Sequence, residues 1–345
     1  MKALVLEEKN KLNLRDFSVS ETMGPGDVKI AIKACGICGS DVHYYTNGRI
    51  GDFVVESPMI LGHEASGVVL ETGADVKNVR AGDRVCMEPG IPDFTSGETL
   101  RGMYNLDPAV RFWATPPIHG CLRETVVHPA SFCFTLPDNV SFHEGALVEP
   151  LAIGFYAAKK ARVSPGDTAL VIGAGTIGIV TALAAGAAGC SKVYIADIKK
   201  GKLDFINQHY SGAIQTINLN ETSIQSFFSK NKITGVDLVF EASGSIKAYD
   251  GICDYLVPGG RMILVGMPSG PAPLDVVAMQ VKEISVETIF RYANIYPLAI
   301  NTIASGKLNV KPLVTKCYPF DRSLEAFEYA AAMPERDVKI MIDLD

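Results

Sequence analysis

The sequence predicts an α/β protein in which a β-rich region precedes a doubly wound parallel sheet. Residues 1 to about 150 hold short apolar runs separated by turn clusters such as GPGD and AGDR, a pattern typical of strands and turns. From about Gly154 onward, apolar runs alternate with stretches of helical length, which indicates a parallel sheet with helices on both faces. A glycine-rich turn joins the first of these later runs to an alanine-rich stretch.

The individual elements follow from the same patterns. In the first region we expect strands at LVL, VKIAIKA and SGVVLETG. The later region predicts strands at Ala169–Ile172, Val193–Ala196, Thr216–Leu219, Val236–Phe240, Met262–Val265 and Ile284–Ile289. The last fifty-odd residues predict a helix at Ser323–Ala332 and a final strand, VKIMIDL. We expect this last part to return to the first domain, which gives boundaries of 1–152, 153–289 and 290–345.

The stretch from Thr168 to Asp197 carries a dinucleotide-binding pattern. A buried strand, the turn G-x-G-x-x-G, a helix and a second strand that ends in a carboxylate follow one another, and together they are far more specific than the glycines alone. Such a turn gives phosphates access to the free N–H groups of a helix N-terminus, and the acid suits a ribose hydroxyl, which favours NAD over NADP. The candidate cofactor contacts are Gly173, Gly175, Thr176, Ile177, Gly178, Asp197 and Lys202.

Composition limits the classes of function. The chain has 345 residues, 48% of them apolar and 20% charged, with a net charge of −6. These values suit two soluble domains and disfavour nucleic acid or an anionic membrane as the main partner. Thr168–Ser191 is uncharged and long enough to span a bilayer, but it is rich in Gly and Ala, so we prefer the dinucleotide interpretation. The eight scattered cysteines and the lack of an export signal predict reduced thiols in a cytoplasmic protein.

Three short segments of the first region carry possible metal ligands: CGICGSDVH around Cys38, GHE around His63 and Glu64, and VEP around Glu149. A catalytic zinc takes about three protein ligands from Cys, His and Asp or Glu. Each segment also has an ordinary interpretation, because Cys35 and Cys38 could form a redox pair, His63 could be a buried structural histidine, and Glu149 could favour a helix N-terminus. A redox pair belongs at a helix start, whereas this one follows a strand in a β-rich region.

Together these segments carry a resemblance that covers essentially the whole chain. GHEASGVV, with CGICGSDVHYY before it and G-x-G-x-x-G far after it, resembles the zinc-containing medium-chain dehydrogenases. Within that family GRIGDF, FWATPP, LPDNVSFHEGALVEPLA and FRYANIYP resemble the polyol dehydrogenases of the sorbitol and xylitol type. The resemblance implies a GroES-like catalytic domain, a Rossmann domain that binds NAD, and a homo-oligomer, often a tetramer or else a dimer.

The resemblance also implies roles for single residues. Cys38, His63 and Glu64 would hold one catalytic zinc, and Glu149 would bind it or contact a water on it. Ser40 and His43 would carry the substrate proton to solvent, and Asp41 would orient a ligand. Relatives often hold a second, structural zinc on four closely spaced cysteines, but no cysteine lies between Cys86 and Cys121 here, so we expect no structural zinc. The candidate substrate contacts are Tyr44, Phe53, Phe112, Arg291 and Tyr292.

The implied activity is oxidation of a secondary hydroxyl of an acyclic sugar alcohol to a ketose. Xylitol to xylulose is our first expectation and sorbitol to fructose the second. The alternatives within the same fold are threonine, butanediol or galactitol-phosphate dehydrogenase, a zinc-independent quinone reductase, and a family member that has lost catalysis. The expected partner is therefore a small molecule.

Overall fold

The computed structural model describes residues 1–332 and 334–344. The chain divides into two compact units, one formed by Met1–Glu149 with Tyr296–Asp345 and the other by Pro150–Ile295. The first unit thus contains both ends of the chain.

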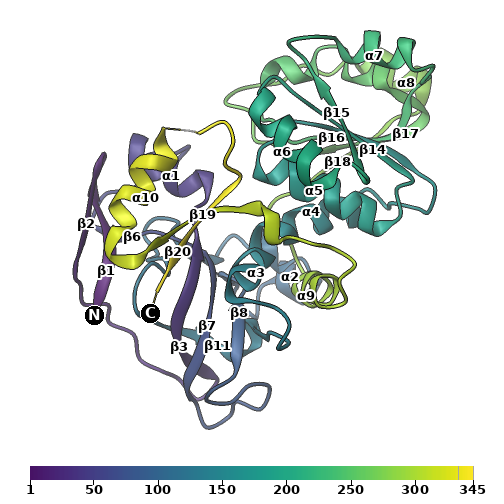
Figure 1. Ribbon diagram of the computed structural model, residues 1–345. Coiled ribbons are helices and arrows are strands. Elements are labelled where there is room, and N and C mark those ends of the chain that lie inside the picture. The colour runs from purple at the N-terminus through teal and green to yellow at the C-terminus, as the bar shows by residue number, and fades with distance from the viewer. Residues whose placement is uncertain (333, 345) are drawn as a thin grey trace. The chain divides into compact units, whose positions relative to one another are not determined.

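The second unit is built on a six-stranded sheet of parallel strands in the order β15-β14-β13-β16-β17-β18 (Figure 1). This order, which reverses direction at the first strand, is that of a Rossmann fold. All six strands predicted from apolar runs are present. The strands are β13 (Thr168–Ile172), β14 (Lys192–Asp197), β15 (Ile214–Asn218), β16 (Val236–Glu241), β17 (Leu256–Leu264) and β18 (Ser285–Thr288).

Helices connect these strands, as the alternation predicted. They are α4 (Val148–Lys160), α5 (Thr176–Ala188), α6 (Lys200–Tyr210), α7 (Ile224–Lys230) and α8 (Val276–Lys282), with short 3-10 turns η3 (Ile246–Tyr249) and η4 (Ile252–Tyr255). The segment Thr168–Ser191 forms β13 and the 13-residue α5, so its apolar character comes from burial within the sheet layer. Among the described residues, no helix is long and apolar enough to cross a membrane.

The first unit is β-rich and contains a seven-stranded sheet in the order β12-β8-β7-β3-β20-β19, with β11 also paired to β3, and a smaller sheet in the order β2-β1-β6. Its strands up to residue 135 are β1 (Lys2–Glu8), β2 (Lys11–Asp16), β3 (Asp27–Gly36), β4 (Arg49–Ile50), β5 (Phe53–Val54), β6 (Met59–Ile60), β7 (Glu64–Thr72), β8 (Arg84–Met87), β9 (Gly90–Ile91), β10 (Arg111–Phe112), β11 (Thr125–Pro129) and β12 (Cys133–Thr135).

Helices interrupt this region, where the sequence patterns had indicated only strands and turns. They are α1 (Gly39–Asn47), α2 (Gly97–Leu100), α3 (Phe142–Ala146) and the turns η1 (Tyr104–Leu106) and η2 (Ala130–Phe132). The first of them begins where the Asp41 carboxylate accepts a hydrogen bond from the backbone N–H of Cys38, at 3.0 Å. A polar residue near a helix start stabilises it without any apolar periodicity, which is why the pattern missed it.

The last segment of the chain completes the first unit. It forms α9 (Tyr296–Ala304), η5 (Lys311–Leu313), β19 (Val314–Pro319), η6 (Phe320–Arg322), α10 (Ser323–Ala331) and β20 (Lys339–Asp343). β20 pairs with β3 in antiparallel fashion and with β19 in parallel fashion, and Figure 1 shows the two yellow strands beside the purple β3. The final strand therefore lies inside the main sheet, between the edge strand β19 and β3, whose end leads to Cys38.

Candidate functional site

Three possible metal ligands meet in the first unit. Cys38 precedes α1, His63 lies in the turn before β7, and Glu64 is the first residue of β7. One donor atom from each lies within 4.8 Å of the others. β3 and β7 are neighbours in the sheet, and Gly36 pairs with Glu64, so the sheet register itself brings the cysteine segment to the His-Glu pair.

Asp41 holds these segments in place. Its carboxylate is fully buried and accepts hydrogen bonds from two backbone N–H groups, that of Cys38 at 3.0 Å and that of Gly62 at 2.9 Å. The same carboxylate lies 3.6 Å from Nδ1 of His63. One side chain thus positions both the thiol segment and the imidazole segment.

Asp41 and His63 each shift the pKa of the other. Burial alone would raise the pKa of Asp41, but the neighbouring His63 and the two backbone N–H donors outweigh it and hold that pKa below its ordinary value. Burial would lower the pKa of His63, yet Asp41 and Cys38 hold it well above its ordinary value. The cluster is therefore an electronegative pocket that favours a cation.

Glu64 has a cationic partner that the sequence analysis missed. The ammonium of Lys339 donates to both carboxylate oxygens at 2.6 Å and to the carbonyl oxygen of Ile37 at 3.1 Å. Burial would lower the pKa of Lys339, but Glu64, Cys38 and Glu149 raise it above its ordinary value. Lys339 begins the apolar final strand. A lysine in so apolar a run could have indicated a buried ionic partner.

The donor set fits a zinc ion. A thiol, an imidazole and a carboxylate are the ligand types of a catalytic zinc with an open fourth position. Nδ1 of His63 faces the Asp41 carboxylate at 3.6 Å, so Nε2 is the nitrogen that can bind a metal. Gly36 leaves room for Glu64, because a Cβ at that position would lie 2.1 Å from the carboxylate oxygen Oε2. The meeting of these three donor types beside the buried Asp41 carboxylate points to a bound cation.

Cys35 is not part of this cluster. Its Sγ lies 3.5 Å from Sγ of Cys121, both side chains are fully buried, and burial raises the pKa of the Cys35 thiol well above its ordinary value. The C-x-x-C pair follows a strand as expected, since β3 contains Cys35, but the expectation that it does not stand at a helix start was wrong, because Cys38 directly precedes α1. The redox interpretation fails for another reason, because a buried thiol with a raised pKa is a poor nucleophile.

The proposed proton-relay residues lie on α1. Ser40 is half-buried and His43 is exposed, with Nδ1 of His43 3.2 Å from Nδ2 of Asn47. Glu149 is buried in the first turn of α4. It does not belong to the group of three donors, but its charge raises the pKa of Lys339, so it lies in the same electrostatic neighbourhood. Direct metal binding by Glu149 stays a prediction.

The predicted substrate contacts fall into three groups. Phe112 is buried with its ring centroid 5.6 Å from that of His63, and Tyr44 is buried on α1, the helix that follows Cys38. Phe53 is 48% exposed and lines a separate pocket of about 290 Å³ with Pro116 and Pro117. Arg291 and Tyr292 belong to the second unit, after β18. The structure thus brings Phe112 to the metal cluster, and the roles of all five remain predictions.

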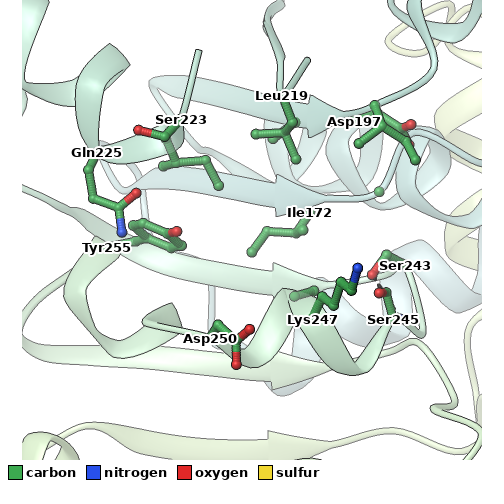
Figure 2. Close-up of a pocket in the computed structure, with 15 residues that line it drawn as sticks. Ile172, Asp197, Leu219, Ser223, Gln225, Ser243, Ser245, Lys247, Asp250 and Tyr255 are labelled. Carbon is green, nitrogen blue, oxygen red and sulfur yellow. Dashed lines mark hydrogen bonds between the residues drawn. The ribbon is translucent and has the colours of Figure 1, made fainter. Parts of the chain in front are cut away.

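The second unit carries a pocket of about 460 Å³ at the carboxyl ends of its central strands. In Figure 2, the apolar side chains of Ile172 and Leu219 separate Asp197 at one end from Gln225 and Tyr255 at the other. In parallel sheets, nucleotides bind at this edge, where the strand order reverses. An apolar centre with polar ends suits an adenosine group.

The glycine turn beside this pocket has the geometry that the sequence predicted. Gly173 has φ of +104°, and a Cβ on Gly178 would lie 1.8 Å from the carbonyl oxygen of Gly173. At Gly175 a Cβ would meet nothing within 4 Å, which leaves the start of α5 open. Thr176 and Ile177 form the first turn of α5, and Lys202 lies in the first turn of α6.

Asp197 ends β14 and lines the pocket. Its carboxylate accepts hydrogen bonds from the backbone N–H groups of Ala174 at 2.5 Å and Lys199 at 2.7 Å. The acid therefore ties the glycine turn to the second strand and fixes its own orientation. Sequence reasoning missed the other polar pocket residues, although their places after β15 and β16 were a usable signal; they are Ser223, Gln225, Ser243, Ser245, Lys247, Asp250 and Tyr255.

Comparisons with known proteins agree with this geometry. Residues 24–138 match the family model described as "Alcohol dehydrogenase GroES-like domain", and residues 176–305 match "Zinc-binding dehydrogenase". The chain belongs to this family of zinc-binding alcohol dehydrogenases, which are oxidoreductases that act on CH–OH groups.

Individual members of the family are similar to this chain over nearly its full length. The D-xylulose reductase of Morganella morganii is 55% identical over 335 residues, which cover 96% of this chain and 98% of the relative. The sorbitol dehydrogenase of Mus musculus is 40% identical over 346 residues, covering 99% and 96%. Among solved structures, the 2R,3R-butanediol dehydrogenase of Bacillus subtilis has a TM-score of 0.90 at 30% identity, covering 100% of this chain and 99% of that one.

Proposed function

We propose that this protein is a zinc-dependent, NAD-linked polyol dehydrogenase that oxidises a secondary hydroxyl of an acyclic sugar alcohol to a ketose. The observation that carries the proposal is the meeting of Cys38, His63 and Glu64 within 4.8 Å, in a chain whose second unit has a dinucleotide-type turn. The similarity to a D-xylulose reductase over nearly the full length supports a polyol as substrate.

Each residue of the metal cluster has a physical task. Cys38, His63 and Glu64 would hold the zinc, Asp41 orients the first two, and Lys339 donates to both carboxylate oxygens of Glu64. When bound, zinc supplies Lewis-acid polarisation of an alcohol oxygen and lowers the pKa of that hydroxyl. We propose that Glu149 binds the zinc directly or contacts a water on it, and its influence on the pKa of Lys339 supports a place near the cluster.

The proton released from the substrate needs a route to solvent. Ser40 lies two residues beyond Cys38 and is half-buried, and the exposed His43 lies one helical turn further on α1. Histidine suits the outer end of such a relay because it exchanges protons near neutral pH. Phe112, packed against His63, would exclude water from the reacting atoms.

The cofactor proposed is NAD rather than NADP. A ribose hydroxyl can donate to the Asp197 carboxylate, whereas a 2′-phosphate would be repelled by it. When bound, NAD would supply the hydride acceptor, and the protein would supply its position and surroundings. Gly173, Gly175 and the first N–H groups of α5 would receive the pyrophosphate.

We propose that the structural zinc that relatives often hold on four closely spaced cysteines is absent here, since no cysteine lies between Cys86 and Cys121. The segment where relatives hold a structural zinc has its own contacts. Asp107 accepts hydrogen bonds from the backbone N–H groups of Asp93 and Ala109, and the ring of Tyr104 packs against Phe132 while its hydroxyl donates to Glu88. These contacts can stabilise the segment in place of a structural zinc.

Xylitol is the first substrate proposed and sorbitol the second. One CH–OH unit changes binding only modestly, so both remain candidates for turnover. The similarity to a butanediol dehydrogenase structure at 30% identity keeps a smaller diol as the second candidate function.

We also propose a homo-oligomer in the cytoplasm. β18 is the last strand of its sheet, and the neighbouring α8 exposes three valines, Val276, Val277 and Val281. Free strand edges and exposed apolar side chains often form subunit contacts. All eight cysteines are free thiols, which suits a reducing compartment.

The test is the initial rate of NADH formation with xylitol, sorbitol, threonine and butanediol in parallel. Each alcohol is offered with NAD and with NADP, before and after removal of the metal by a chelator. The proposal predicts a rate that is selective for polyols and NAD and disappears with the metal. A rate that does not depend on the metal would favour a quinone-reductase type of activity, and no rate with any alcohol would favour a non-catalytic family member.

A further inference from the structure

A second group of possible metal ligands lies in the first unit, separate from the proposed catalytic cluster. His143, Cys317 and Asp343 each offer one donor atom within 4.8 Å of the others. Nε2 of His143 lies 2.5 Å from Oδ1 of Asp343. These residues share no ligand with the Cys38 group, and the relatives' structural zinc falls on a different segment of the chain.

Three different elements create this second group. Cys317 lies on the edge strand β19 and pairs with Met341 of β20, and Asp343 lies two residues further along β20. Because side chains alternate between the faces of a strand, Cys317 and Asp343 project from the same face of the sheet. His143 comes from α3, whose start is anchored because the hydroxyl of Ser66 on β7 donates to the carbonyl oxygen of Phe142 at 2.5 Å. The convergence is therefore built by the sheet and not by a loose loop.

The chemistry of the three donors selects the ion. A thiolate excludes magnesium and calcium, which prefer oxygen ligands, and a mixed sulfur, nitrogen and oxygen set suits zinc. We propose that His143, Cys317 and Asp343 form a second zinc site, with water in the fourth position. Ligand atoms around a tetrahedral zinc lie about 3.4 Å apart for bonds of about 2.1 Å. The His143–Asp343 pair must open by about 1 Å to reach this geometry, which rotation of the carboxylate provides.

Zinc at this site would act as a structural crosslink. The side chains of His143 and Asp343 are 35% and 42% exposed, and Cys317 is exposed, so the ion can enter directly from solvent. It would join the edge strand β19 and the end of β20 to α3, three elements held otherwise by hydrogen bonds and packing. Because it binds only the folded chain, it raises the unfolding temperature in a zinc-dependent way.

The test compares zinc content in the wild type, Cys317→Ser and Cys190→Ser after equilibration with zinc and removal of the excess. Cys190→Ser is the matched control, because that half-buried thiol lies in the second unit outside both groups of donors. We expect the loss of about one zinc per chain in Cys317→Ser and none in Cys190→Ser. Equal zinc content in wild type and Cys317→Ser would overturn the proposal. The difference between the two holds whether or not the catalytic cluster binds zinc.

A second measurement uses Co²⁺ as a spectroscopic probe. In Cys38→Ser the catalytic thiolate is gone, so any absorption from a cobalt–thiolate bond must come from another site. We expect this absorption in Cys38→Ser and its loss in Cys38→Ser/Cys317→Ser. Its absence from the single variant, or its persistence in the double variant, would overturn the proposal. If Cys38→Ser does not fold, the comparison of zinc content in the wild type and Cys317→Ser still decides.

Discussion

Lys339 and Glu64, 275 residues apart in the sequence, form a buried ion pair in which the ammonium contacts both carboxylate oxygens at 2.6 Å. The two side chains are 3% and 1% exposed. The pair places the negative charge of Glu64 at the metal cluster. The positive charge of Lys339 compensates it in the protein interior. The lysine comes from β20, the last strand, which pairs with β3 in the main sheet.

Replacing Lys339 by Met should destabilise the protein strongly. The substitution leaves the buried Glu64 carboxylate without its partner, which costs about 3–5 kcal/mol in comparable cases. Urea unfolding of zinc-free protein measures the loss. Lys29→Met is the matched control, since its partner Glu71 is 59% exposed and such pairs contribute about 1 kcal/mol or less. Similar losses in the two variants would show that the buried pair has no special role.

Gly175→Ala should separate dinucleotide binding from folding. The backbone at Gly175 suits any residue, with φ of −68°, and a Cβ there meets no protein atom within 4 Å, so the variant should unfold like the wild type. The methyl group would instead occupy the space proposed for the pyrophosphate, and we expect NAD affinity to fall at least about tenfold, which is roughly 1.4 kcal/mol. Isothermal titration with NAD measures it.

Two further glycines on the same helix serve as controls. Gly186 is exposed on α5 with open space around it, and Gly186→Ala should leave NAD binding unchanged while it stabilises the helix by about 1 kcal/mol. Gly178→Ala should impair folding itself, because its Cβ would lie 1.8 Å from a carbonyl oxygen. Unchanged NAD affinity in Gly175→Ala would contradict the proposed position of the phosphates.

Glu88→Gln should change how stability depends on pH. Burial raises the pKa of Glu88 to about 8, against a smaller opposite effect of the hydrogen bond from Tyr104. Between about pH 4.5 and pH 8 the unfolded chain loses this proton while the folded chain keeps it, so the carboxyl lowers stability as pH rises through that range. The full effect is on the order of a few kcal/mol.

The variant removes this titration and keeps an acceptor for the Tyr104 hydroxyl. Relative to wild type it should gain stability at pH 8.5 and gain little at pH 4.5, as measured by thermal unfolding at both pH values. A constant difference between the two proteins across that range would mean that Glu88 does not titrate as described.

Val281→Glu should weaken the proposed oligomer. Val281 is 79% exposed on α8, and a charge on an apolar subunit contact is costly because it must be desolvated. Sedimentation velocity should show a smaller species for this variant. Leu100→Glu is the control, since Leu100 is 75% exposed on α2 of the first unit and its substitution should leave assembly intact. A wild-type protein that sediments as a monomer would refute the proposed assembly.

The sheet of the second unit was predictable because its central strands β13, β14 and β16 contain continuous buried apolar runs, whereas the edge strands β15 and β18 are less buried. Helix α1 was not predictable, since its start depends on one hydrogen bond from the backbone of Cys38 to Asp41 rather than on periodicity. The metal donors could be named from residue types and family resemblance. Their meeting depends on the register of β3 against β7, which a sequence pattern does not contain.

Lys339 and the His143–Cys317–Asp343 group escaped prediction for a related reason. Each joins residues more than 170 positions apart through the place of β20 in the main sheet. Single-sequence patterns report local structure, whereas these contacts arise from the return of the chain to its first unit. The isolated lysine in the apolar final strand was the one local hint.

The central claim is that oxidation depends on a metal held by Cys38, His63 and Glu64. The most direct test measures NADH formation from xylitol by metal-stripped wild type before and after addition of zinc, beside Cys38→Ser treated in the same way. The account predicts that zinc restores the rate of the wild type and that Cys38→Ser stays at least about a hundredfold slower, a loss of roughly 2.7 kcal/mol in transition-state stabilisation. Equal rates in the stripped and zinc-loaded wild type, or full activity in Cys38→Ser, would contradict it.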